Sequence, residues 1–118
     1  PMGEMIAFGH VSGAISVYQV DENDDYTLLH EINAAHDGPV NTIQFSPFSP
    51  DGSLLVSGGA DGMMRFWNAA DGTSIWDVSA HDSGVEAVTF AANGHVMASG
   101  GTDGSLVVWA VPTVPPFE

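Results

Sequence analysis

A serine, a histidine and an aspartate recur together twice along the chain, and these three residue types are the ones that perform nucleophilic catalysis in many hydrolases. The two sets are His36, Ser57 and Asp61, and His81, Ser99 and Asp103. A hydrolase needs one such constellation with its serine exposed on a sharp turn, and the sequence has no Gly-x-Ser-x-Gly elbow. Because the trio is repeated, we interpret it as a structural device and expect no catalytic residue and no enzyme activity.

Metal and cofactor chemistry finds equally little support. The chain has no cysteine, and its five histidines lack the paired spacing of a zinc site. They are His10, His30, His36, His81 and His95. The glycine-rich runs GGADG and GGTDG resemble phosphate loops faintly, but the lysine of such a loop is missing. We therefore predict no metal and no cofactor.

An acidic run at residues 21–25 is the best alternative site. Asp21, Asn23 and Asp25 stand at the first, third and fifth positions of a calcium loop. The sixth position, however, is Tyr26 instead of glycine, and the twelfth is Ile32 instead of a bidentate glutamate. The run is better explained as a solvated loop between two strands, and calcium binding stays an open alternative.

The elements that must position these residues form a repeat. The segment from His36, HDGPVNTIQFSPFSPDGSLLVSGGADGMMRFWN, returns from His81 as HDSGVEAVTFAANGHVMASGGTDGSLVVWA, 45 residues later. A third, partial copy upstream, MIAFGHVSGAISVYQV, places Phe8 on Ser57, Ser12 on Asp61 and Tyr18 on Trp67. The apolar Phe48 lies in a turn insertion of the second copy, and its side chain could either pack under the loop or contact a partner.

Local patterns within each copy are typical of short β-strands separated by tight turns. Four runs rich in β-formers are Val40–Phe45, Leu54–Ser57, Met63–Asn68 and Ile75–Val78. Asp-Gly and Asn-Gly dipeptides between such runs tolerate the positive φ that a tight hairpin needs. The sequence therefore predicts an all-β fold with four antiparallel strands per repeat. These strands are named A to D in chain order.

A four-stranded repeat of this length with a leading histidine and a closing tryptophan resembles the WD-repeat β-propeller family. The resemblance covers about residues 5–111. It implies three blade units and an exit: a degenerate blade at 1–32 with strands B, C and D, full blades at 33–78 and 79–111, the last without a clear outer strand, and a proline-rich exit or linker at 112–118.

The resemblance also implies a hydrogen-bonded tetrad in each of the two full copies. The indole N–H would donate to the hydroxyl, the hydroxyl to the imidazole and the imidazole to the carboxylate. The members would be His36, Ser57, Asp61 and Trp67 in the second blade, and His81, Ser99, Asp103 and Trp109 in the third. The chain departs from the family where Ala precedes each leading histidine, and where Trp67-Asn68 and Trp109-Ala110 replace Trp-Asp.

The charge balance restricts the partners of the chain. Fifteen acidic residues stand against one basic residue, Arg65, which gives a formal net charge of −14. Proteins bind phosphate backbones and anionic lipid through Lys and Arg, so we expect no direct nucleic-acid or membrane partner. No run approaches a membrane span and no leader opens the chain, so an intracellular, cytoplasmic location is favoured. The acidity is consistent with a basic partner, with a salt-rich cytoplasm or with plain solubility.

The function implied by the resemblance is a protein–protein interaction scaffold. Positions carried over from the family's binding surface flank the tetrads; they are Asp37, Asn41, Ala60, Asp82, Glu86 and Thr102. Their acidity predicts basic peptide or protein segments as partners. Two alternatives stay open: a purely architectural block in a large assembly, and the non-catalytic propeller region of a longer multidomain enzyme. Because blades bury their faces against neighbours, we also expect the chain to be part of a larger chain or complex.

Overall fold

The computed structural model describes residues 4–33, 35–45, 54–69, 71–91 and 96–110. Every regular element in this part of the chain is a β-strand. The strands are β1 (Glu4–Gly9), β2 (Ile15–Val20), β3 (Tyr26–Ile32), β4 (Val40–Phe45), β5 (Leu54–Gly59), β6 (Met63–Asn68), β7 (Thr73–Ser79), β8 (Val85–Phe90), β9 (Val96–Gly101) and β10 (Leu106–Ala110). The prediction of an all-β fold is confirmed.

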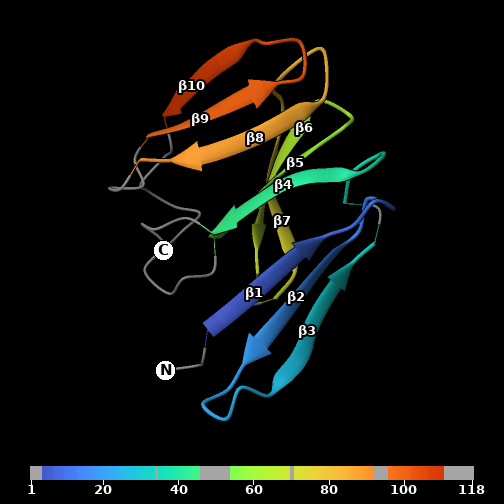
Figure 1. Ribbon diagram of the computed structural model, residues 1–118, viewed down its shortest axis with the longest axis vertical. Coiled ribbons are helices and arrows are strands. Elements are labelled where there is room, and N and C mark those ends of the chain that lie inside the picture. The colour runs from blue at the N-terminus through green and yellow to red at the C-terminus, as the bar shows by residue number, and fades with distance from the viewer. Residues whose placement is uncertain (1–3, 34, 46–53, 70, 92–95, 111–118) are drawn as a thin grey trace.

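The strands form three antiparallel sheets in chain order. The first sheet is β1-β2-β3, the second is β4-β5-β6-β7 and the third is β8-β9-β10. Within each sheet, every strand pairs with the next one along the chain, as hairpins do. Figure 1 shows the sheets side by side as the blades of a partial propeller, with β4 lying between β1 and β8.

The second sheet is covered on both faces, because it stands between the other two. Its strand β5 is buried at every position, whereas β3 and β10 are mostly exposed or half-buried. A β-strand sends alternate side chains to opposite faces, so β5 supplies both neighbours. Val56 belongs to the cluster shared with the third sheet, and Leu55 to the cluster shared with the first.

The core is therefore divided into two layers, each lying between a pair of sheets. One layer joins the second and third sheets and includes Met64, Phe66, Val88 and Met97. The other joins the first and second sheets through residues such as Ile15, Val17 and Trp67. Burial of these apolar layers between sheets is the main source of stability in such a stack.

The strand predictions agree with the structure at residue level where the local pattern was strong. β4 and β6 coincide with the predicted runs Val40–Phe45 and Met63–Asn68, and β5 and β7 extend the other two runs. β7 ends at Ser79, one residue past the predicted boundary of the second unit. Phe48 and the predicted exit at 112–118 lie outside the described residues.

Candidate functional site

In the second sheet, four polar side chains form one continuous chain of hydrogen bonds. The indole N–H of Trp67 donates to Oγ of Ser57 at 2.9 Å, and Ser57 Oγ lies 2.7 Å from Nε2 of His36. On the other side of the imidazole, Nδ1 of His36 lies 3.0 Å from Oδ1 of Asp61. The carboxylate is only an acceptor, so Nδ1–H donates to it and Nε2 accepts from the serine. Every polar group in this chain has a partner.

The backbone around this network explains why these residue types stand here. Asp61 also accepts from the backbone N–H of Met63 at 3.0 Å and of Asp37 at 2.9 Å, which holds the turn after β5. Gly59 lies beneath the hydrogen bond between His36 and Asp61, and a Cβ there would approach Nδ1 of His36 to 2.5 Å. Only glycine leaves room for the histidine to reach the aspartate.

Burial and hydrogen bonding set the ionisation of this pair. Burial lowers the pKa of His36 below its usual 6.5, although Asp61 partly opposes this effect. Burial alone would raise the pKa of Asp61, but the amides of Asp37 and Met63 and the imidazole of His36 together lower it below 3.8. At neutral pH the site therefore holds a neutral imidazole beside a carboxylate.

In the third sheet, the corresponding network contains one more member. Trp109 donates to Oγ of Ser99 at 2.9 Å, and Ser99 Oγ lies 2.9 Å from Nε2 of His81. Nδ1 of His81, however, lies 2.7 Å from Oγ of Ser105, which in turn donates to Oδ1 of Asp103 at 2.6 Å. The imidazole and the carboxylate are linked through a hydroxyl and not by a direct contact.

Ser105 is the residue that sequence reasoning missed. It occupies the position of Met63 in the second copy, two residues after the aspartate. The hydroxyl of Ser105 lowers the pKa of Asp103, and its own backbone N–H adds to this effect. A comparison of Met63 with Ser105 in the two copies could have predicted this contact, since a hydroxyl two residues after an aspartate often bonds to that carboxylate.

The first sheet has a different arrangement, which follows from its degenerate repeat. Phe8 and Tyr18 meet edge to face, with ring centroids 5.8 Å apart. Nε2 of His10 lies 2.7 Å from Oγ of Ser16. His10 stands where Gly59 stands in the second copy, so this histidine comes from the strand end itself. No tetrad of the second-sheet type is present among the described residues of this sheet.

The six positions carried over for partner binding are all exposed. The amide of Ala60 donates to the carbonyl of Pro39, and the amide of Thr102 to that of Gly84, so both turns are held by backbone bonds. Nδ2 of Asn41 donates to the carbonyl of Val85 at 3.0 Å, which ties the inner strands of two sheets together. Asn41 is thus engaged between sheets. Within the described part of the chain, the side chains of Asp82 and Glu86 make no hydrogen bond or ion pair.

Small residues make this surface continuous across two sheets. A Cβ added at Gly38 would lie 3.5 Å from Cβ of Ala60, and one at Gly84 would lie 3.2 Å from Cα of Ala60. The turn of the second sheet therefore touches the loop that leads into the third sheet. Asp37 and Asp82, each two residues or fewer from these glycines, rim the same surface.

An open polar hollow of about 250 Å³ adjoins this surface beside the third network. Asp82, Asp103, His81 and Ser105 line it together with apolar or small residues of the same sheet region. Two carboxylates in the lining of a hollow attract a cationic group, such as the end of a lysine or arginine side chain.

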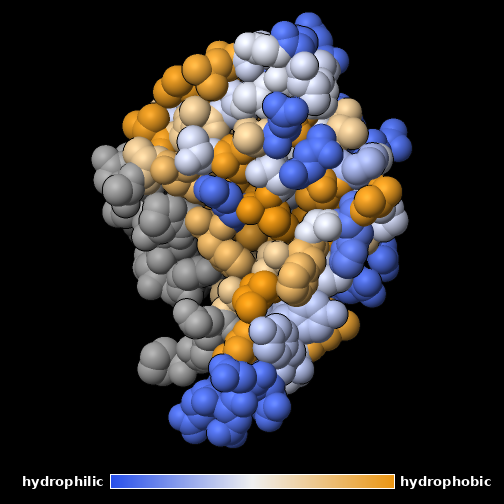
Figure 2. Space-filling model, in the orientation of Figure 1, coloured by the Kyte–Doolittle hydropathy of each residue, from blue (hydrophilic) through white to orange (hydrophobic). Residues whose placement is uncertain are grey.

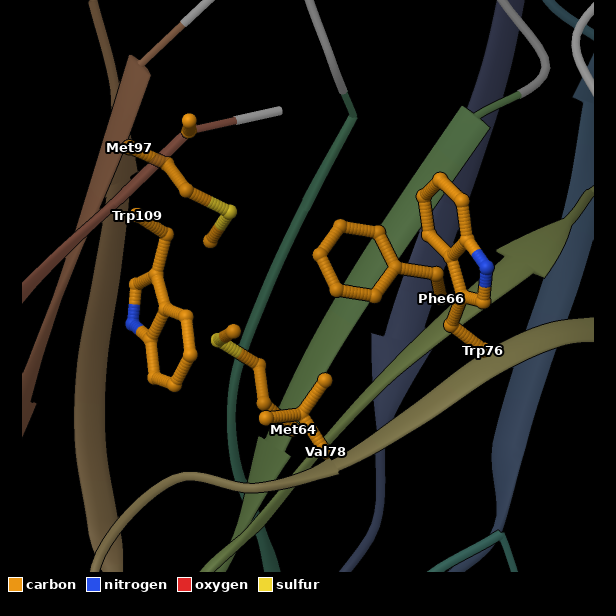
Figure 3. Close-up of a pocket in the computed structure, with 7 residues that line it drawn as sticks. Met64, Phe66, Trp76, Val78, Met97 and Trp109 are labelled. Carbon is orange, nitrogen blue, oxygen red and sulfur yellow. The ribbon is translucent and has the colours of Figure 1, made fainter. Parts of the chain in front are cut away.

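A second hollow, of about 260 Å³, is apolar and lies between the second and third sheets. Figure 3 shows the side chains of Met64, Phe66, Trp76, Val78, Met97 and Trp109 around it. The rings of Phe66 and Trp76 pack edge to face, with their centroids 5.4 Å apart. The indole N–H of Trp109 donates to Oγ of Ser99. Its lining includes no charged side chain, so it extends the packing layer between the sheets.

The other chemistry considered from the sequence is placed as follows. Ser57 and Ser99 are both 0% exposed, so neither hydroxyl is open to a substrate. Oδ1 of Asp21 accepts the backbone N–H groups of Asn23 and Asp25 at 2.8 and 3.0 Å, which closes the acidic loop on itself. Within the described ranges, no group of three or more His, Asp or Glu side chains is arranged to hold a metal ion. None of these residues forms a helix long and apolar enough to cross a bilayer.

Comparison with known proteins agrees with the repeat. Residues 26–68 and 72–110 match the family model described as "WD domain, G-beta repeat". Each match begins at or just before the first residue of an outermost strand, β3 or β7, and ends with the third strand of the next sheet, β6 or β10. The family model thus frames the repeat one strand earlier than the sheets do.

Two curated relatives and a solved structure are similar to this chain over part of their length. The small ribosomal subunit protein RACK1 of Glycine max is 40% identical over 63 residues, which are 53% of this chain and 18% of that protein. The periodic tryptophan protein 2 homolog of Dictyostelium discoideum is 30% identical over 90 residues, 75% of this chain and 9% of its own length. The computationally designed Ika4 protein superposes with a TM-score of 0.73 at 25% identity, covering 92% of this chain and 61% of that one.

Proposed function

Since the chain belongs to the WD40 repeat family, we propose that it is a non-catalytic scaffold that binds a basic segment of a protein partner on the surface around Asp37, Ala60 and Asp82. WD40 repeats generally act in protein interactions, and the distinguishing feature of this chain is its charge. The single observation that carries the proposal is the continuity of this exposed surface across two sheets, with acidic side chains on its rim. This surface is called the acidic face below.

The chemistry of the acidic face supports a cationic ligand. Asp82 and Asp103 border the polar hollow, and Glu86 is exposed on the adjoining strand β8. A lysine or arginine side chain entering the hollow would meet carboxylates, and neighbouring basic residues of the same segment would lie along the rim. Exposed charge pairs contribute little individually, so affinity would come from several of them together.

Buried networks under the acidic face serve it by holding the turns in place. His36 and Asp61 fix the turn that presents Ala60, and His81, Ser105 and Asp103 fix the turn that presents Thr102. Because hydrogen bonds already hold these turns in place, the turns lose little conformational entropy when a partner binds.

The test is fluorescence polarisation with a labelled peptide of alternating lysine and glycine and with an acidic peptide of the same length. We expect the basic peptide alone to bind, and its affinity to fall as salt is raised. Asp82→Asn and Glu86→Gln should each weaken binding by about 1.4- to fivefold, as expected for exposed charge pairs worth roughly 0.2–1 kcal/mol.

The control is Glu22→Gln, which removes the same charge from the exposed loop between β2 and β3. Equal losses for all three substitutions would mean that net charge alone attracts the peptide, and the proposed acidic face would be wrong. Binding that does not change with salt would also contradict the proposal.

A further inference from the structure

A hollow in the apolar layer between the second and third sheets is large enough to hold a small molecule. Its volume is about 260 Å³. An engineered cavity of about 150 Å³ lined by apolar side chains accepts benzene, so this one has room for two fused rings. Figure 3 shows its lining, to which β6 and β7 contribute Met64, Phe66, Trp76 and Val78, and β9 and β10 contribute Met97 and Trp109. This space is called the apolar hollow below.

The equivalent layer between the first and second sheets closes more completely over its tryptophan. Trp67 holds there the position of Trp109 and is only 6% exposed. Ile15 and Val17 belong to the same cluster as Trp67, and both are fully buried. Trp109, by contrast, is half-buried, and the apolar hollow lies beside it. Two layers built by the same repeat are therefore filled to different degrees.

Aromatic rings and sulfur atoms form much of the lining of the apolar hollow. Figure 3 shows the ring of Phe66 and the side chains of Met64 and Met97 directed into the space. Aromatic rings prefer edge-to-face or offset contacts with other rings, as Phe66 already makes with Trp76. Methionine sulfur also makes favourable contacts with the edges of rings. The lining therefore favours an aromatic ligand over a saturated one of the same shape.

The lining offers a ligand almost no polar group. Its surface is nearly all apolar, and it includes no charged side chain. The indole N–H of Trp109 already donates to Oγ of Ser99 at 2.9 Å. A charged ligand would lose its water there without gaining a partner, and a peptide main chain would leave N–H and C=O groups unpaired. The apolar hollow therefore selects a neutral molecule over an ion or a peptide.

The apolar hollow is also separate from the charged parts of the molecule. Figure 2 shows hydrophilic residues gathered over the loop between β2 and β3, at the lower end of the view, whereas β9 and β10 lie at the upper end of Figure 1. Asp37, Ala60 and Asp82, which define the acidic face, do not line the apolar hollow. Binding in the hollow and binding on the acidic face can therefore be tested independently.

We infer that the apolar hollow binds a small neutral aromatic molecule of one or two fused rings, inserted between Phe66 of the second sheet and Trp109 of the third. Burial of the rings and their contacts with aromatic and sulfur-containing side chains provide the affinity. This binding site lies beyond the proposed scaffold function and does not depend on it, so either can fail without the other.

Titration of the full chain with 2-naphthol, followed through the indole N–H signals of its three tryptophans by NMR, tests the inference. The signals of Trp76 and Trp109 should move saturably, whereas that of Trp67, which lies in the other layer, should not. Decahydro-2-naphthol, which has the same two rings in saturated form, should bind about 2- to 13-fold more weakly, which corresponds to the roughly 0.5–1.5 kcal/mol of contacts between rings. The anion 2-naphthoate should cause no saturable shift.

Two substitutions that fill the apolar hollow from opposite sides make the result specific. Val78→Phe on β7 and Ala110→Leu at the end of β10 each enlarge a lining side chain. Each should weaken binding of 2-naphthol by about tenfold, which corresponds to about 1.4 kcal/mol. Val11→Phe is the matched control, since Val11 is 83% exposed in the turn between β1 and β2, and it should leave the affinity unchanged. If circular dichroism shows that Val78→Phe does not fold, Ala110→Leu carries the test, because Ala110 is exposed.

The inference is wrong if the filling variants bind 2-naphthol as the parent chain does, or if Val11→Phe weakens binding as much as they do. Equal movement of the Trp67 signal would place the ligand outside the apolar hollow. Equal affinity for the saturated alcohol would overturn the choice of an aromatic ligand. A titration without saturable shifts would mean that side-chain packing closes the hollow in solution, and would overturn the inference as well.

Discussion

The second and third sheets carry the same four polar residue types, yet only the second brings its histidine and aspartate into contact. His36 lies 3.0 Å from Asp61, whereas His81 reaches Asp103 through the hydroxyl of Ser105. Asp61 lies in a turn packed against the backbone of the third sheet, and Asp103 lies in an exposed turn. The direct contact between histidine and aspartate thus occurs in the second sheet, which has a neighbouring sheet on both faces, and not in the third sheet.

The packing around equivalent glycines also differs between the two sheets. Gly58 is pressed against Val85, and Gly100 faces open space. A position that must be glycine for packing reasons in one copy is thus free of that restriction in the other.

Gly58→Ala should destabilise the protein by about 1–3 kcal/mol, because its Cβ would overlap Val85 and also approach Cγ2 of Thr42 to 2.9 Å. Gly100→Ala is the matched change on the third sheet. It should be neutral or stabilise by about 0.4–1 kcal/mol, since alanine restricts the unfolded chain. Urea unfolding followed by circular dichroism measures both, and equal losses would mean that the surroundings of the two glycines do not differ as described.

His36→Ala should cost about 1–3 kcal/mol, because Ser57 and Asp61 lose a partner. Asp61→Ala should then cost much less in the His36→Ala background than alone. The same double-mutant cycle on His81 and Asp103 should give a smaller coupling than on His36 and Asp61, because no direct bond joins His81 to Asp103. Additive losses for His36 and Asp61 would contradict the network in the second sheet.

Ser105→Ala should cost about 0.5–1.5 kcal/mol and loosen the third network, because both His81 and Asp103 lose the hydroxyl. Hydrogen exchange of the Trp109 indole N–H reports this locally and should accelerate, while that of Trp67 should not change. Ser105→Met, which introduces the residue found at position 63, is the companion variant. If Ser105→Ala leaves both indole signals unaltered, the relay through the hydroxyl does not hold the tryptophan.

Acid should weaken the second network in two steps. The folded pKa of His36 lies below 6.5, so the unfolded chain binds its proton first and stability falls as the pH drops from 6.5 towards the lower folded value. Asp61, whose folded pKa lies below 3.8, adds a further loss as the pH falls through that region. His36→Gln should flatten the first step in pH-dependent urea unfolding, and a profile that keeps its slope would assign the step to another group.

Much of the fold follows from short-range pattern. Residues such as Val40–Phe45 and Met63–Asn68 alternate or concentrate β-formers between tight turns, and the strands form where this pattern predicts them. The repeat of the leading histidine and closing tryptophan also places both sets of polar residues at matched positions of successive sheets. These features depend on spacing along the chain, which the sequence contains in full.

What only the tertiary structure decided is the environment that each copy of the repeat experiences. At equivalent positions of the repeat, Gly58 packs against Val85, whereas Gly100 faces open space. Likewise, Asp61 contacts its histidine directly, whereas Asp103 accepts a hydrogen bond from the hydroxyl of Ser105. Sequence repetition specifies a sheet, but not which of its faces finds a neighbour. Burial and contact depend on where whole sheets lie relative to one another, and that arrangement involves residues far apart in the chain.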